Sequence, residues 1–313
     1  MNTLPRLIVV LGPTASGKSA LGIEIARRIG GEILVCDSTQ VYRYFDIGTA
    51  KVPAGAQKGI PHHLVNLVEP TELFTAGDFR RCALEALGDL RSRGKVPVLT
   101  AGTGLYLRAL LEGLSEAPVR SEELRERLRC RARLHGPEYL HRLLARLDAA
   151  AAHRIAPRDA QKVIRAIEIR VLAKKSVGEV HGAGRLPLEG YEILKLGLNP
   201  PREALYARIH ARIDSMLAEG WLEEVRRLID AGIPHEAKPF QFIGYSELRA
   251  HLQGTMPLAE AIQKIRLATR NFAKRQLTWF RREPRVHWLS GFGDAPVTLD
   301  QAFALISSPL LSD

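Results

Sequence analysis

Apolar and polar positions follow two alternating patterns in the first hundred or so residues, and together these patterns predict an α/β core. Compact apolar runs with the length and β-branched content of buried strands are found at 6–11, 32–36 and 96–100. The first run leads through a Gly-rich loop into residues 19–29, where apolar side chains recur at helical spacing. Strands that alternate with helices predict a parallel sheet with helices on both faces.

The pattern changes twice further along the chain. Residues 120–175 are rich in Arg and Glu at helical spacing and show no strand pattern, so we expect an all-helical insertion. Gly and Pro mark 178–190 as a connector, and 191–198 (YEILKLGL) is typical of a strand that returns to the sheet. Helical patterns follow over 200–228 and 256–282. The predicted organisation is a first part of a phosphate-loop core (1–118), a helical insertion domain (119–185) and a second core part (186–313).

The segment between the first predicted strand and its helix matches the phosphate-binding loop pattern G-x-x-x-x-G-K-S at every specified position. In such a loop, backbone amides surround two phosphates, the lysine neutralises them and the hydroxyl that follows reaches Mg²⁺. The loop is typical of proteins that bind nucleotides such as ATP. The predicted site comprises Gly12, Pro13, Thr14, Ala15, Ser16, Gly17, Lys18 and Ser19, with Ser19 as ligand of the expected cofactor, Mg²⁺.

An acid that would hold the metal of an ATPase is missing after 96–100, where the sequence continues Ala-Gly-Thr-Gly. An acid lies instead at Asp37, directly after the second strand. Because ligands of parallel sheets bind at the carboxyl ends of the strands, Asp37 and Thr103 are expected at the same edge as the phosphate loop. A carboxylate there can act as an outer ligand of the metal or as a general base, or simply cap a helix or turn.

Other metal ligands are poorly placed. His62 and His63 are adjacent and lack zinc spacing, so we interpret them as structural. The cysteines, Cys36, Cys82 and Cys130, form no C-x-x-C pair, which is typical of a reducing cytoplasm and favours neither disulfides nor zinc. No apolar run approaches the roughly 18 residues that span a bilayer, so no membrane partner is expected.

Basic residues are in excess, which points to a phosphate-rich partner. The 313 residues include 45 Lys and Arg against 34 Asp and Glu, a formal net charge of +11. Such a charge attracts polyanions, although it also serves solubility alone. Arg266, Arg270 and Lys274 fall on one stripe of the last predicted helix, which favours binding to a phosphate backbone. Phe272 and Trp279 on the same helix are expected to pack in the core.

A series of segments between residues 7 and 288 resembles, in chain order, the bacterial tRNA dimethylallyltransferases of the tRNA isopentenyltransferase family. The segments are GPTASGKS (12–19), CDSTQVYRYFDIGTAKV (36–52), PHHL (61–64), GDFRR (77–81), AGTGLYLRALLEGL (101–114), HRIAPRDAQKVIRAIEI (153–169), LYARIHARIDSML (205–217), IGYSEL (243–248) and TRNFAKRQLTWFR (269–281).

The resemblance implies transfer of a dimethylallyl group from dimethylallyl diphosphate to N6 of adenosine 37, in tRNAs that read codons beginning with U, with release of diphosphate. It also accounts for the missing acid, because the loop then holds the diphosphate of an allylic donor and no nucleotide need be hydrolysed. The implied partners are a tRNA anticodon stem-loop and the donor, and the implied protein is a cytoplasmic monomer.

The resemblance also implies roles for individual residues. Thr14, Lys18 and Arg212 are expected at the leaving diphosphate, with Arg212 favoured over Arg208 by its place in the motif. Asp37 is expected at the amine as hydrogen-bond acceptor and base. Adenosine 37 is expected to flip into a channel between the core and the insertion. The residues implied to contact tRNA are Asp37, Ser38, Thr39, Gln40, Thr103, Arg125, Gln161, Lys162, Val163, Ile164, Arg165, Gln241, Phe242, Ile243, Gly244 and Tyr245.

Two other functions stay open from the residues alone. A small-molecule kinase shares the loop and the sheet, but it leaves the basic helices without a role and requires ATP. A non-catalytic RNA-binding protein with a regulatory nucleotide site accounts for the basic stripe, but it gives Asp37 no chemical role.

Overall fold

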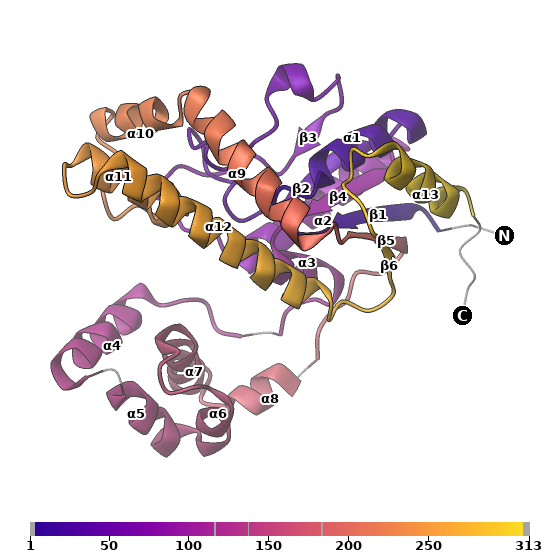
Figure 1. Cartoon of the computed structure of the whole chain (residues 1–313). Helices are drawn as coiled ribbons and strands as arrows, with labels where there is room; N and C mark the ends of the chain where they lie inside the picture. The colour runs from indigo at the N-terminus through magenta and orange to yellow at the C-terminus, as the bar shows by residue number, and fades with distance from the viewer. Residues whose placement is uncertain (1–3, 116, 137, 183, 309–313) are drawn as a thin grey trace. The chain divides into compact units, whose positions relative to one another are not determined.

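The computed structural model describes residues 4–115, 117–136, 138–182 and 184–308, and within them the core is a six-stranded parallel sheet (Figure 1). The strand order is β3-β2-β4-β1-β5-β6. The strands are β1 (Arg6–Leu11), β2 (Glu32–Cys36), β3 (His62–His63), β4 (Pro97–Ala101), β5 (Glu192–Leu198) and β6 (Val286–Leu289). The predicted α/β fold with a parallel sheet is confirmed.

The carboxyl ends of three neighbouring strands lie level with one another. Leu11 of β1 and Cys36 of β2 both pair with Ala101, the last residue of the strand between them. The loops that follow these strands therefore begin at one edge of the sheet. This register brings the phosphate loop, Asp37 and Gly102 together, although they are far apart in the sequence.

Helices cover both faces of the sheet: α1 (Lys18–Ile29), α2 (Ala76–Ser92), α3 (Gly104–Leu111) and α13 (Pro296–Ser307). On one face, Val10 of β1 shares a core with Leu21 of α1 and Ile306 of α13. The neighbouring strand residues Leu7 and Val9 are buried on the opposite face, which α2 and α3 cover (Figure 1). Successive side chains of β1 thus point to opposite faces of the sheet and pack against the helices on each face.

Helices from the second core part build another apolar core beside the sheet: α9 (Arg202–Ala218), α10 (Trp221–Asp230), the short 3₁₀ helix η2 (Lys238–Gln241), α11 (Tyr245–Leu252) and α12 (Leu258–Phe280). Trp221, Phe240 and Ile265 are buried in this core together with Ala15 of the phosphate loop. Helices α9 and α12 lie side by side (Figure 1). The shared core fixes these two helices next to the loop.

Residues 111–188 form a separate compact unit. Its described part contains helices and no strand: α4 (Glu122–His135), α5 (Tyr139–Leu147), α6 (Ala149–Arg154), α7 (Ala160–Ala173) and α8 (Val177–Gly182). Leu140, Leu144 and Ile167 are buried at its centre. The unit is wider than the 119–185 expected from the sequence, because the chain from 111 and the chain before 189 also pair, with the N–H of Leu188 donating to the carbonyl of Leu111 at 3.0 Å.

Several short elements lack a sequence signal and were not predicted. The strands β3 and β6 and the helix α13 are absent from the expectations, and α8 begins at Val177 and runs into the predicted connector. The single helix expected over 200–228 is two helices, divided at Gly220, whose φ of +98° favours glycine. Pairing to a larger sheet or core stabilises such short elements, and a local pattern does not reveal it. Among the described residues, no helix is long and apolar enough to cross a membrane.

Candidate active site

The phosphate loop turns sharply between β1 and α1. Gly17 has φ +88°, and a Cβ built on it would lie 2.8 Å from the backbone nitrogen of Gly293, so this position requires glycine. The N–H of Gly293 donates to the carbonyl of Ser16 at 2.9 Å. The turn that precedes α13 therefore closes one side of the loop, a contact that no local sequence pattern indicates.

Lys18 lies in the cavity formed by the loop. Its ammonium donates to the carbonyl of Pro13 at 2.7 Å. Burial lowers the pKa of Lys18 to about 8, while the carboxylate of Asp37 raises it and the charge of Arg212 lowers it further. A bound anion would offset this cost of burial, which makes Lys18 suited to holding a phosphate group.

Arg208 and Arg212, one turn apart on α9, both line this cavity, but their surroundings differ. Arg208 forms a two-fold ion pair with Asp294, of which the Nη1–Oδ1 bond measures 2.8 Å. Arg212 makes no hydrogen bond or ion pair with any described residue, and burial lowers its pKa although Asp37 raises it. Of the two guanidinium groups, that of Arg208 therefore has a protein partner and that of Arg212 has none among the described residues.

Asp37 lines both cavities and uses one carboxylate oxygen for its own turn. Its Oδ1 accepts hydrogen bonds from the N–H and the hydroxyl of Thr39, at 2.8 and 2.7 Å. A Cβ built on Gly102 would lie 2.7 Å from Oδ2, so only glycine fits there. Thr103 supports the same turn, because its Oγ1 accepts from the N–H of Ser38 at 2.9 Å.

Two cavities meet at Asp37 and share Thr14, Arg212 and Phe272. The first has a volume of about 500 Å³ and contains Lys18 and Ser19 of the phosphate loop. The second has a volume of about 300 Å³ and a mostly apolar wall, formed by Ile209, Ile213, Met216, Trp221, Phe242, Ile243 and Phe272. The site therefore joins a cationic compartment to an apolar one, with a carboxylate between them.

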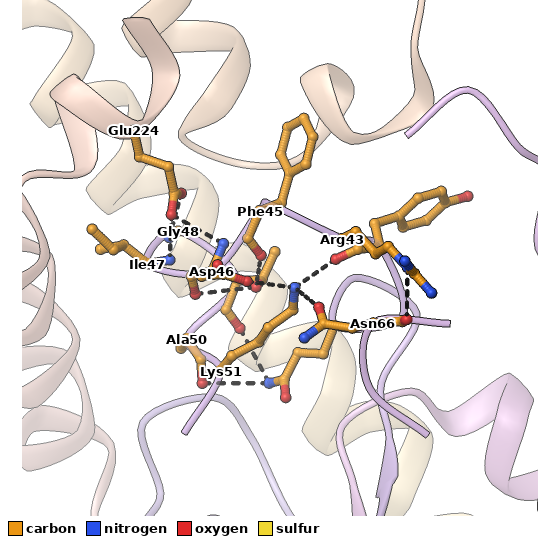
Figure 2. A network of polar contacts seen from close by, with 12 residues as sticks. Arg43, Phe45, Asp46, Ile47, Gly48, Ala50, Lys51, Asn66 and Glu224 are labelled. Carbon is orange, nitrogen blue, oxygen red and sulfur yellow. Dashed lines mark hydrogen bonds and ion pairs between the residues drawn. The ribbon is translucent and has the colours of Figure 1, made fainter. Parts of the chain in front are cut away.

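The loop over 46–48 contributes Gly48 to the apolar cavity and is held by a buried carboxylate that no local sequence pattern indicates. Glu224 of α10 accepts from the N–H groups of Asp46, Ile47 and Gly48, at 3.0, 2.8 and 3.4 Å (Figure 2). Its Oε1 also accepts from the hydroxyl of Tyr245 at 2.6 Å, and burial raises the pKa of that hydroxyl. Glu224 thus receives four donors and fixes this loop.

Lys51 and Gln40 form hydrogen bonds with the residues on either side of the loop over 46–48. The ammonium of Lys51 donates to Asp46, to Asn66 and to the carbonyl of Tyr42 (Figure 2). The side-chain amide of Gln40 donates to the carbonyl of Thr49 at 3.1 Å. Gln40, expected to contact tRNA, therefore shapes the wall of the cavity with its amide nitrogen.

The residues expected at tRNA over 241–245 divide between the apolar cavity and the protein interior. Gln241, Phe242 and Ile243 line it from the end of η2. Tyr245 is fully buried, and Gly244 is buried against the indole of Trp221. The side chain of Tyr245 therefore serves the protein interior.

In the insertion, the residues expected to contact tRNA divide into buried and exposed groups. Val163 and Ile164 are buried in the core of the unit. Arg125 donates to the buried carboxylate of Glu168 at 2.9 and 2.7 Å, and Arg165 donates to it at 2.5 Å. Gln161 and Lys162 at the start of α7 are exposed. The ammonium of Lys162 donates to Asp159 at 2.6 Å, so Gln161 is the polar side chain of this set that no described residue engages.

The basic stripe of α12 is also divided. Arg266 pairs with Asp214 at 2.6 Å, and Arg270 lies over the ring of Tyr206. Beyond them Lys274, Arg275 and Arg282 are exposed and surround a surface hollow together with Asn271, Thr278 and Trp279.

The expectation that Phe272 and Trp279 pack in the core is wrong. Phe272 lines both cavities of the site. Trp279 is 39% exposed and packs its indole against Gly104. The seven-residue spacing places both rings on one face of α12, and that face meets the site and the glycine turn after β4 instead of a closed core.

His62 and His63 each contact an oxygen of the protein. His63 Nε2 lies 2.7 Å from the carboxylate of Glu32, and a nitrogen of His62 lies 2.8 Å from the carbonyl of Ile60. No group of three or more His, Cys, Asp or Glu side chains comes together at metal-binding distance in the described part of the chain.

Comparison with known proteins gives the family. The model of the IPP transferase family matches residues 40–283. The chain is 50% identical to a tRNA dimethylallyltransferase of Solibacter usitatus, over 93% of this chain and 94% of that protein. It is 49% identical to that of Koribacter versatilis, over 97% and 99%.

Solved structures agree with the sequence comparisons. A full-length tRNA isopentenylpyrophosphate transferase from Bacillus halodurans is 36% identical and superposes with a TM-score of 0.71, over 96% of this chain and 95% of that one. A eukaryotic dimethylallyltransferase captured acting on tRNA is 26% identical, with a TM-score of 0.83 over 99% and 81%. With a phosphate loop, a carboxylate and an apolar cavity at one sheet edge, the chain belongs to the IPP transferase family.

Proposed function

We propose that this protein transfers a dimethylallyl group from dimethylallyl diphosphate to N6 of adenosine 37 in tRNAs that read codons beginning with U. The relatives that it matches over nearly their whole length are named tRNA dimethylallyltransferases. The observation that carries the proposal is the pair of cavities that meet at Asp37. A cationic compartment suits the diphosphate, and an apolar one suits a five-carbon chain and a flipped base.

The chemistry follows from charge movement. The N6 amine attacks C1 of the donor, the N6–C1 bond forms, and the C1–O bond to diphosphate breaks with its electron pair left on the diphosphate. Lys18 and Arg212 stabilise the negative charge that accumulates there, together with Thr14 of the loop. Asp37, whose Oδ2 accepts no hydrogen bond from a described residue, accepts the proton that N6 loses.

The residues present fit a magnesium ion that is held mainly by the substrate. Ser19 is exposed at the wall of the cationic cavity, next to Lys18. The described residues provide no cluster of acidic ligands, and Mg²⁺ commonly keeps waters and binds phosphate oxygens with one or two protein ligands. We assign the protein ligand to Ser19, and the ion would neutralise charge on the diphosphate when bound.

The tRNA would be recognised at two kinds of surface. Exposed Lys274, Arg275 and Arg282 on and after α12 supply cations for phosphates. Thr39, Gln40 and Thr103 lie beside Asp37, where a flipped adenosine has to be held. In the insertion, we assign tRNA contact to the exposed side chains of Gln161 and Lys162. We place the enzyme in the cytoplasm as a monomer, a state that light scattering of the purified protein would test.

One assay tests the proposed function. Purified protein is incubated with labelled dimethylallyl diphosphate, Mg²⁺ and unmodified tRNA bearing A36-A37-A38, without ATP. We expect label at N6 of adenosine 37, and no label in a tRNA with guanosine at position 37. Absence of incorporation under these conditions, or a requirement for ATP, would exclude the proposal and favour a kinase.

A further inference from the structure

Gln276 of α12 is a buried polar residue at the centre of the site, and no sequence pattern pointed to it. Its side chain is 6% exposed, and both ends of the carboxamide are used. Oε1 accepts from the N–H of Thr14 at 2.7 Å, and Nε2 donates to the carbonyl of Gly102 at 2.8 Å. The residue therefore bridges the loop after β1 and the loop after β4.

One of the two groups bonded to Gln276 lies in the loop proposed to bind the diphosphate, and the other lies beside the proposed base, Asp37. Thr14 belongs to the phosphate loop and lines the cationic cavity. Gly102 lies against the carboxylate of Asp37, since a Cβ built on it would come within 2.7 Å of Oδ2. The next residue, Thr103, holds the N–H of Ser38. A shift of the Gly102 turn would therefore move Asp37 relative to the donor loop.

Few side chains can make this bridge. The position needs an acceptor for an N–H and a donor for a C=O at the same reach, which a carboxamide supplies. A carboxylate would keep the first bond and turn a negative oxygen toward the carbonyl of Gly102, with Asp37 nearby. An apolar side chain of equal length would leave a buried N–H and a buried C=O without partners.

We propose that Gln276 is a positioning residue that sets the donor loop against the turn carrying the base, and so governs the rate of transfer more than the binding of either substrate. The inference rests on the proposed function. Gln276 acts through backbone groups of Thr14 and Gly102, so it need not touch the reacting atoms. Misplacement of reacting groups by about 1 Å costs on the order of 10²-fold in rate.

The test compares Gln276→Met and Gln276→Glu with Gln263→Met, a matched substitution at an exposed position of the same helix. Steady-state and single-turnover rates are measured with labelled dimethylallyl diphosphate and unmodified tRNA, below the midpoint of thermal unfolding of every variant. For Gln276→Met we expect kcat to fall about 10²-fold, with donor KM and tRNA Kd within about threefold of the parent. Gln263→Met should match the parent throughout.

Gln276→Glu gives an independent readout through pH. At pH 8 the introduced carboxylate should repel the carbonyl of Gly102, and the rate should fall at least as far as in Gln276→Met. As the pH falls toward 5.5 the carboxyl group gains a proton and can donate to Gly102, so the ratio of variant to parent rate should rise, whereas that of Gln276→Met should stay flat.

These measurements test the positioning role of Gln276 separately from the proposed transferase activity. A raised donor KM at unchanged kcat, or parental rates in both variants, would overturn the positioning role while leaving the transferase activity intact. A flat rate ratio for Gln276→Glu would likewise contradict it, including where Gln276→Met fails to fold. An inactive parent protein would instead refute the proposed function.

Discussion

The cavity and the insertion each contain a small cluster of buried or half-buried charges, and the two clusters are built in opposite ways. In the insertion, Glu168 is completely covered and receives both Arg125 and Arg165. In the cavity, Lys18 and Arg212 lie near Asp37 without a direct ion pair to it among the described contacts. One cluster is saturated by the protein itself, and the other is left for a ligand.

The difference separates structural from functional charge. A buried ion with a complete set of partners has little to gain from a further ligand, whereas cations that burial destabilises gain most from an incoming anion. The pKa shifts of Glu168 and Lys18 reflect this difference. Burial alone would raise the pKa of Glu168, but Arg125, Arg165 and a backbone N–H bring it down to about 2. Burial lowers that of Lys18 to about 8.

The largest expected effect is at the carboxylate of the cavity. Replacing Asp37 by Asn should lower the single-turnover rate by about 10²- to 10⁴-fold, because the amide cannot accept the proton from N6. Donor affinity should change little, since the cations at the diphosphate remain. Titration with the donor and rapid-quench incorporation measure the two quantities. Incorporation at the parental rate would remove Asp37 from the chemistry.

Substitution in the cluster of Glu168, Arg125 and Arg165 should lower the stability of the protein. Glu168→Gln leaves two arginines beside an uncharged group, and we expect a loss of about 3–5 kcal/mol in the stability of the insertion, measured by chemical denaturation of the whole protein. The matched control is Glu126→Gln on α4, whose pairs with Arg129 and Arg133 are exposed and screened by solvent, so this substitution should change stability much less. Equal losses of stability in Glu168→Gln and Glu126→Gln would mean that the burial of Glu168 and its arginines adds nothing to the effect.

The same cluster predicts a dependence on pH with a definite sign. The folded-state pKa of Glu168 lies below its ordinary value, so its contribution to stability is complete above about pH 4.5 and is lost as the pH falls toward 2. The loss should be absent from Glu168→Gln in the same range. Parallel pH–stability curves for parent and variant would contradict this assignment.

The two arginines of α9 test whether an unpaired cation is the functional one. Arg212→Met should lower kcat by about 10²- to 10³-fold, as expected for a group that stabilises charge on the leaving diphosphate. Arg208→Met removes a cation already held by Asp294, and it should cost about tenfold or less, the scale of a partly exposed ion pair. Steady-state rates at saturating donor decide between them, and a reversed order would exchange their roles.

The sequence predicts the cavity better than it predicts the insertion surface, and the comparison explains why. Parallel strands of matched length fix where the phosphate loop, Asp37 and Thr103 meet, so local patterns were enough. The contact segment at 161–165 was assigned as a continuous run, but a helix turns its residues in different directions. Val163 and Ile164 consequently face the core, and Arg125 faces Glu168.

Long-range polar partners are the part that spacing cannot supply. Gln276 lies 262 residues from Thr14, and Glu224 lies 178 residues from Asp46. Neither pair has a local signature, because the bonds run to backbone groups that any residue type carries. Asp294 holds Arg208 across 86 residues in the same way, in a segment where the sequence shows no recognisable pattern.

The smallest effect expected concerns the protonation of Lys18. The free protein holds this lysine with a pKa near 8, and an anion binds the ammonium form better than the amine, so binding takes up a proton above that pH. Donor affinity should therefore be constant below about pH 7.5 and fall by up to about tenfold per pH unit above 8. Lys18→Met should bind the donor more weakly and show no such fall, which separates titration of the lysine from that of other groups. A parallel loss of donor affinity in the parent and in Lys18→Met between pH 8 and 9 would mean that another group titrates. Lys18 would then be a structural charge, like Glu168 and its arginines in the insertion.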